Sequence, residues 1–185
     1  MFGGSFSYLY KPIGLSVNIS DRLLTWAASA AAVLQAVTRL SFGYLYDKVG
    51  FKKLFNILMV INVVNSVICY PARDYPPLYF VCILLNYMVY AGIFAIFPTP
   101  AAQTFGPRYG AQVYSIILVA GLVAAIANAL HNKILYGMMG LEASYLFNIG
   151  GVYSVIGIII NNFFSEKLDI EKMEKKGKIQ WKEEI

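Results

Sequence analysis

Charged residues are scarce in this sequence. Only 14% of its 185 residues are Asp, Glu, Lys or Arg, whereas soluble domains carry roughly 25%. The few charges cluster in short loops and near the C-terminus, and long apolar runs of helical length lie between them. The sequence therefore predicts an all-α integral membrane protein. Its net charge of +5 is explained by membrane topology and contact with lipid headgroups, and predicts no nucleic-acid partner.

Cysteine and histidine are even rarer. The two cysteines, Cys69 and Cys82, lie inside apolar segments without the spacing of a metal site or a disulfide framework, and there is a single histidine. No catalytic triad, metal cluster or phosphate-binding loop can be recognised. We therefore expect no enzyme, no catalytic residue, no metal and no cofactor.

Five apolar segments are long enough to form transmembrane helices, at about 21–46, 54–70, 78–97, 112–130 and 144–164. Glycines and a proline interrupt residues 1–20, which predicts a remnant of a truncated first helix at the interface rather than a span. We divide the chain into this segment, a five-helix membrane half-domain at 21–165 and a charged tail at 166–185. The positive-inside rule places the tail and the loop around Lys48 on the inner side.

That loop, residues 43–53, is the most informative stretch. Gly43 and Gly50 frame it, and their lack of a side chain allows close backbone approach. Asp47 is an anion suited to the N-terminus of a neighbouring helix. The bases Lys48, Lys52 and Lys53 mark the inner side.

The residues Gly43, Asp47, Lys48, Gly50, Lys52 and Lys53 fill every position of the pattern G-x-x-x-D-[RK]-x-G-x-[RK]-[RK]. This loop resembles the motif of the major facilitator superfamily of secondary transporters, where it gates and packs the helices. The resemblance implies half of a twelve-helix bundle, the C-terminal half with its first helix truncated. With Arg39 and residues 98–110, the chain is most similar to the oxalate/formate antiporter branch, which is related to monocarboxylate transporters.

Arg39 lies two helical turns from Asp47, about 12 Å deeper along the helix axis. The resemblance implies that this position supplies a positive charge to a small carboxylate. An arginine in an apolar segment normally faces a cavity or a partner. The alternative is that Arg39 extends toward the inner surface and pairs with Asp47 or a lipid phosphate.

Two departures from the branch weaken the predicted anion site. The penultimate helix of the branch carries a second base, but residues 115–121 contain none. Gln103 replaces the acid that often precedes the next loop. The other polar residues within the spans could line a cavity or form interhelical hydrogen bonds, and these are Gln35, Asn62, Asn65, Asn86 and Asn128.

Two functions remain open. The chain could be a transporter-derived half retained as a structural or accessory subunit of a larger membrane assembly, and the incomplete half and missing second base favour this hypothesis. Alternatively, it could be the C-terminal half of a split secondary transporter for mono- or dicarboxylates. Both require other membrane protein chains as partners. An organelle inner membrane, such as the mitochondrial one, is the expected location.

Overall fold

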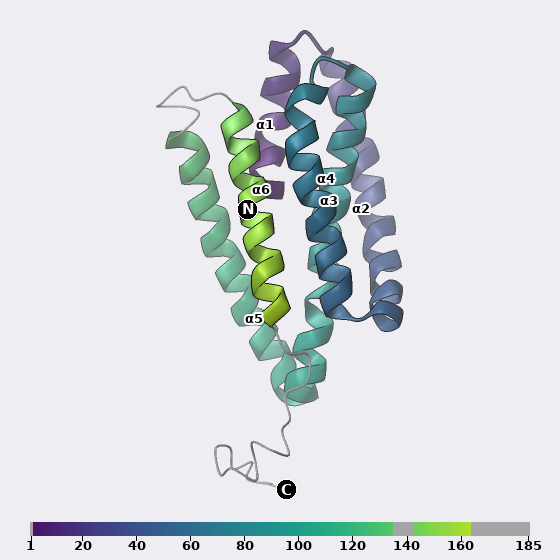
Figure 1. Ribbon diagram of the computed structural model, residues 1–185. Helices are drawn as coiled ribbons and strands as arrows, with labels where there is room; N and C mark the ends of the chain where they lie inside the picture. The colour runs from purple at the N-terminus through teal and green to yellow at the C-terminus, as the bar shows by residue number, and fades with distance from the viewer. Residues whose placement is uncertain (1, 135–142, 164–185) are drawn as a thin grey trace, which may run out of the picture.

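The computed structural model describes residues 2–134 and 143–163, and these residues form α-helices and no strand. The helices run alternately in opposite directions along the bundle (Figure 1). Their bounds are α1 Phe2–Ser16, α2 Asp21–Val49, α3 Phe51–Ala72, α4 Pro76–Ile96, α5 Pro98–Asn132 and α6 Ala143–Phe163. The predicted all-α fold is confirmed.

Four segments are long and apolar enough to cross a membrane, namely Asp21–Val49, Phe51–Ala72, Pro76–Phe105 and Tyr109–Asn132. Within α6, Phe147–Phe163 is a shorter apolar helix. Large apolar side chains are exposed along these segments, for example Leu40 at 80% and Val33 at 67%. Such surfaces suit lipid or another membrane helix, and the chain is an integral membrane protein.

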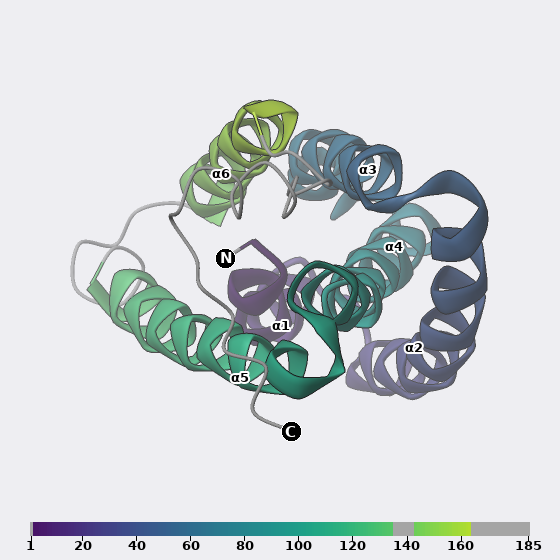
Figure 2. The ribbon, with the colours of Figure 1, turned by 90° about the horizontal axis from the view of Figure 1, so that it is seen from below.

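The helices are not evenly packed around the bundle. Seen along its axis, α3, α4, α5 and α6 surround α1, and α2 lies on the outer side of α4 (Figure 2). The strongest helix pairs are α2 with α4 and α3 with α6. By contrast, the apolar part of α5 is almost entirely exposed and packs lightly on α1 and α4. This arrangement leaves interior space between α5 and its neighbours.

Two apolar clusters hold the two ends of the bundle. One joins α1 to α3, α4 and α6, with Phe6 against Phe147 at 5.5 Å between ring centroids. There the Tyr79 hydroxyl donates to the Tyr10 carbonyl oxygen at 2.8 Å. The second cluster joins the ends of α2, α3 and α4 around Leu54 and Leu58. The middle of the bundle lies between these clusters.

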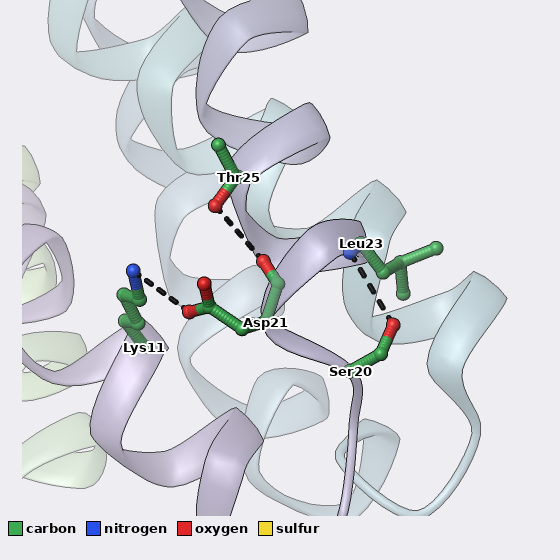
Figure 3. Close-up of polar contacts among 5 residues, drawn as sticks. All are labelled: Lys11, Ser20, Asp21, Leu23 and Thr25. Atoms are coloured by element: carbon green, nitrogen blue, oxygen red, sulfur yellow. Dashed lines mark hydrogen bonds and ion pairs between the residues drawn. The ribbon is translucent and has the colours of Figure 1, made fainter.

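The turn between α1 and α2 is fixed by local polar contacts (Figure 3). Asn18 adopts a positive φ of 61°, and Ser20 caps α2 by accepting from the Leu23 N–H at 3.4 Å. Lys11 Nζ lies 2.8 Å from Asp21 Oδ1. This hydrogen-bonded acid raises the pKa of Lys11, which lies outside the four long apolar segments. The pair is exposed, so it fixes the turn geometry more than it adds stability.

A reversal of the chain follows the start of α5. A methyl group at Gly110 would lie only 2.7 Å from the Ala102 Cα, although eight residues separate the two positions. A straight helix would separate them by about 12 Å. The chain therefore turns back between them, and this reversal separates the spans Pro76–Phe105 and Tyr109–Asn132.

The helix bounds differ from the predicted ones in two places, at the end of α3 and at residues 98–111, which lie between two predicted spans but belong to α5. Residues 1–20, predicted as a remnant of a truncated first helix, contain the 15-residue helix α1 with Pro12 inside it, and α1 is not among the four segments long and apolar enough to cross a membrane. Pro71 does not end the second predicted span, since α3 continues to Ala72. A proline in the last turn leaves only one earlier carbonyl without its partner, which a helix end tolerates. The domain limits at 20 and 165 stay predictions.

Candidate functional site

The predicted loop motif lies at the junction of α2 and α3. Lys48 lies in the last turn of α2, and its ammonium is 4.6 Å from the centre of the Tyr44 ring. Lys52 Nζ donates to the Asn162 carbonyl oxygen at 2.7 Å and so ties the start of α3 to the end of α6. Lys53 is exposed. The motif therefore joins three helices at one end of the bundle.

The two motif glycines have different surroundings. Gly50 has a φ of 81°, a conformation that favours glycine, and its N–H donates to the Tyr46 carbonyl oxygen at 2.9 Å. Gly43 lies inside α2, and a methyl group there would meet no described atom within 4 Å. The expected close approach at Gly43 is therefore not made within the described part of the chain.

Asp47 is exposed in the last turn of α2 and forms no hydrogen bond or ion pair with another residue that the structure describes. No side chain caps the start of α3. The expected contact between Asp47 and a helix N-terminus is thus not made at α3. The neighbouring Tyr46 hydroxyl instead donates to Gln103 Oε1 at 2.9 Å, which connects α2 with α5.

Arg39 projects from the part of α2 that is long and apolar enough to span the membrane. It is exposed and has neither an ion pair nor a hydrogen bond among residues 2–134 and 143–163. In particular, it does not pair with Asp47. A base at this depth costs at least a few kcal/mol unless it meets a counter-charge or water. No such counter-charge lies among the described residues.

A cavity of about 260 Å³ lies in the middle of the bundle, between α3, α4, α5 and α6. We call it the asparagine cavity, because α3, α4 and α5 contribute Asn62, Asn86 and Asn128 to its lining. The lining residues are Met59, Asn62, Asn86, Val89, Tyr90, Ile93, Phe94, Gly121, Ala124, Ala125, Asn128, Tyr153 and Ser154. Arg39 is not among them.

The polar groups of the asparagine cavity are unequally satisfied. Asn62 Nδ2 donates to Ser154 Oγ at 3.0 Å, which is one of the predicted interhelical hydrogen bonds. Asn86 is only 1% exposed, and neither its Nδ2 nor its Oδ1 has a hydrogen-bond partner among the described residues. Each buried unsatisfied polar group costs about 1–3 kcal/mol. The sequence identifies Asn62, Asn86 and Asn128 as possible cavity-lining residues, but it does not indicate that Ser154 and Tyr153 also line the cavity.

A second hollow of about 340 Å³ lies between α3, α5 and α6 near the loop motif. Phenylalanine rings dominate it, including Phe51, Phe55 and Phe97, and the ring centroids of Phe51 and Phe97 are 5.7 Å apart. Asn161 borders it but is satisfied by Asn56 Oδ1 and the Lys52 carbonyl. This hollow is mainly apolar, and its polar lining residues are Thr104 and Asn161.

A bundle of long apolar helices, with a charged loop at one end and asparagine amides beside a cavity between its helices, defines a polytopic membrane protein. Residues 1–183 match the sequence profile of the Major Facilitator Superfamily. The chain therefore belongs to this superfamily, as its loop motif predicts.

Three curated relatives are distant. The chain is 25% identical to apicoplast pyruvate carrier 2 of Toxoplasma gondii over 151 residues, which cover 78% of this chain and 22% of that protein. It is 27% identical to apicoplast pyruvate carrier 1 of the same organism over 136 residues, 66% of this chain and 24% of the relative. It is 25% identical to the oxalate:formate antiporter of Oxalobacter formigenes over 116 residues, 62% of this chain and 28% of the relative.

The predicted likeness to the oxalate/formate antiporter is thus confirmed. The matched regions make up only about a quarter of these relatives. No solved structure shows a significant match to the chain.

Proposed function

We propose that this chain supplies the anion-contacting half of a carrier for small carboxylates, with no enzymatic role. A second helical unit, provided by another chain or by a longer polypeptide, would face α2. The observation that carries this proposal is Arg39, a base within a membrane segment that has no counter-charge among the described residues.

The chemistry of Arg39 suits this role. A guanidinium offers two parallel N–H groups to a carboxylate and stays charged at every physiological pH. The exposed positions three residues before and four residues after it, on the same face of α2, are Ala36 and Gly43, which carry no polar side chain. Another protein surface that closed over this face would exclude water and strengthen the interaction with an anion. The relatives support the choice of ligand, because their names describe carriers of pyruvate and of oxalate and formate.

The accessory-subunit hypothesis is the second candidate. It is supported by the 115–121 segment, which contains no second base, and by the apolar surface of α5. In such an assembly, Arg39 would pair with an acid of a neighbouring subunit and the exposed faces would be subunit contacts. Both hypotheses require further membrane-spanning helices beside this chain, and they differ in what Arg39 binds.

To test the proposal, the tagged chain is purified from its own cells in a mild detergent together with its companions, which mass spectrometry identifies. The intact complex is then reconstituted into vesicles, and uptake of labelled pyruvate and oxalate is measured. Arg39→Gln should lower uptake at least tenfold, since hydrogen bonds to charged groups contribute about 1.5–3 kcal/mol. Arg39→Lys should retain part of the activity.

Arg22→Gln is the matched control, because Arg22 is an exposed base in the first turn of the same helix. It should transport like the unaltered complex. If the purified complex takes up neither carboxylate, or if Arg39→Gln transports normally, the carrier proposal is wrong. Arg39→Gln complexes that lose companion subunits would support the accessory role.

The membrane in which the chain acts also belongs to this proposal. We infer an organelle inner membrane and keep the mitochondrion as the predicted one. Two relatives are named for a different organelle, the apicoplast. Fractionation of organelles followed by detection of the tagged chain would check the location.

A further inference from the structure

The asparagine cavity is a candidate binding site that is separate from Arg39. Its lining contains amide and hydroxyl groups from four helices, and none of the lining residues is charged. The remaining walls are apolar side chains such as Met59, Val89 and Ile93. A site of this kind can recognise hydrogen-bonding groups, but it cannot neutralise a full charge.

Asn86 gives the site its specificity. It is 1% exposed, and both ends of its carboxamide lack a partner in the described part of the chain. Asn62 presents an acceptor too, because its Oδ1 has no described partner whereas its Nδ2 is engaged by Ser154. These unpaired atoms have almost no exposed surface although both residues line the cavity, so a ligand would reach the donor and acceptor of Asn86 and the acceptor of Asn62 after a side-chain rotation.

We propose that the asparagine cavity binds a small uncharged molecule that carries an adjacent hydrogen-bond donor and acceptor. This is the pattern of a primary carboxamide or of a short carboxylic acid in its protonated form. Either group pairs with the Asn86 carboxamide through two hydrogen bonds, because its donor faces Oδ1 while its acceptor faces Nδ2. A carboxylate has acceptors only, so one of its oxygens would lie against Asn86 Oδ1, and the two acceptors would repel each other. It would also bring a negative charge that no lining residue neutralises.

The volume limits the size of the ligand. About 260 Å³ is far more than one water molecule needs, but it is below the roughly 300–1,000 Å³ of sites for drug-sized ligands. A molecule of a few non-hydrogen atoms fits this range. The site is independent of the carrier proposal, because Arg39 does not line the cavity and the ligand is uncharged.

The test compares two fluorinated probes of nearly equal shape, trifluoroacetamide and trifluoroacetate. The purified chain, with its companions, is placed in lipid nanodiscs, and 19F NMR line broadening is measured against nanodiscs without protein. Trifluoroacetamide should broaden in a saturable way. Asn86→Leu should abolish the saturable broadening, because leucine has a similar volume and no hydrogen-bonding group.

A filled cavity provides a second variant. A methyl group at Gly121 would meet no described atom within 4 Å, so Gly121→Leu should project into the cavity without a clash and abolish binding. Ala120→Leu is the matched control, since Ala120 is exposed on the same helix and does not line the cavity. It should bind trifluoroacetamide normally. Circular dichroism confirms that each variant is folded.

Competition then distinguishes the two sources of the ligand pattern. Propanamide at neutral pH and propionic acid at about pH 4.5, where a good part is protonated, are added to the bound probe. Displacement by either supports the site and identifies its class. Displacement by neither overturns the proposal, and so does broadening that persists in Asn86→Leu. If trifluoroacetate also broadens and this broadening is lost in Asn86→Leu, an anion occupies the cavity and the proposal is overturned too. If the trifluoroacetate broadening is lost only in Arg39→Gln, the anion binds at Arg39, which concerns the carrier proposal.

Discussion

Asn86 and Asn161 are both buried asparagines within apolar helices, but their hydrogen bonding is opposite. Asn161 Nδ2 donates to the Lys52 carbonyl at 3.0 Å and to Asn56 Oδ1 at 2.8 Å. Asn86 has no described partner for either end of its amide. The same substitution should therefore affect stability in opposite directions at the two positions.

We expect Asn86→Leu to raise the free energy of unfolding by about 1 kcal/mol, because the leucine removes an unsatisfied amide and keeps the volume. Asn161→Leu should lower it by about 1–3 kcal/mol, since it leaves the Lys52 carbonyl and Asn56 without their donor. Denaturant unfolding in detergent, followed by circular dichroism, measures both. A loss of stability in Asn86→Leu would show that its amide is satisfied in the folded protein.

The asparagines within the spans also show what the sequence alone does not predict. The sequence identifies Asn62, Asn65 and Asn86 as polar groups within the spans, but it leaves open whether they line a cavity or bond between helices. The structure shows both outcomes, since Asn65 Nδ2 donates to the Cys82 carbonyl at 3.1 Å and Asn86 lines the cavity. The difference depends on which neighbouring helix faces each position, and one chain's hydropathy does not contain that information.

At the scale of elements, α3 and α6 approach each other closely where Ser66 faces Gly151. A methyl group at Gly151 would overlap Ser66 Oγ, whereas Ser66 Cβ would stay 3.4 Å away. The Ser66 hydroxyl donates within its own helix to the Val63 carbonyl at 2.7 Å, so it is not free to turn aside without losing that bond. Small residues at this contact permit the tight packing that membrane helices require.

Gly151→Ala should therefore destabilise the bundle by about 1–3 kcal/mol. Adding Ser66→Ala should restore most of the loss, because it removes the overlapping oxygen. Gly43→Ala is the matched control within a helix, as its methyl group would meet no described atom. That control should be neutral or slightly stabilising, since alanine favours helix over glycine. Thermal unfolding of the three variants and the unaltered protein checks this, and an unaffected Gly151→Ala would contradict the close packing.

The positions of the helices can largely be predicted from the apolar runs and from the charged residues and prolines that separate them. Apolar runs of about 20 residues, separated by charged or proline-containing turns, locate most bounds of the long helices to within three residues, although the third predicted span, 78–97, continues to Phe105. The sequence predicts α1 only as a remnant of a helix, because glycines and Pro12 suggest an interruption, and its buried face of Phe6, Leu9 and Ile13 packs on α3, α4 and α6. Tertiary packing outweighs local propensity there.

At the scale of the whole molecule, the bundle places two groups of charges at opposite ends. The hydrogen bond from Lys52 to Asn162 brings the start of α3 and the end of α6 to the same end, which also carries Lys48 and Lys53 (Figure 1). The opposite end carries the turn from α1 to α2 and the turn from α3 to α4, with Lys11, Arg22 and Arg73, and the end of α5, with Lys133. This distribution bears on the orientation of the chain in the membrane.

The end that carries the loop motif should face the inner side. Lys53→Cys should react with a membrane-impermeant maleimide added from the inner side, and Lys133→Cys from the outer side. Both lysines are exposed, whereas the native Cys69 and Cys82 are buried, so background labelling should be low. Labelling of Lys53→Cys from the outer side would reverse the assignment.

The loop motif alone does not set this orientation. The three motif lysines and Arg108 are balanced by Lys11, Arg22, Arg73 and Lys133 on the opposite side. Residues 166–185 add six lysines at the end of α6, and positive charges near a span outweigh acids in setting topology. Removing residues 166–185 should therefore make the two sides equal and give a mixed population, in which Lys53→Cys is labelled from both sides of sealed vesicles. If the shortened chain still inserts in one orientation, the loop motif or a partner chain fixes the topology instead of the tail lysines.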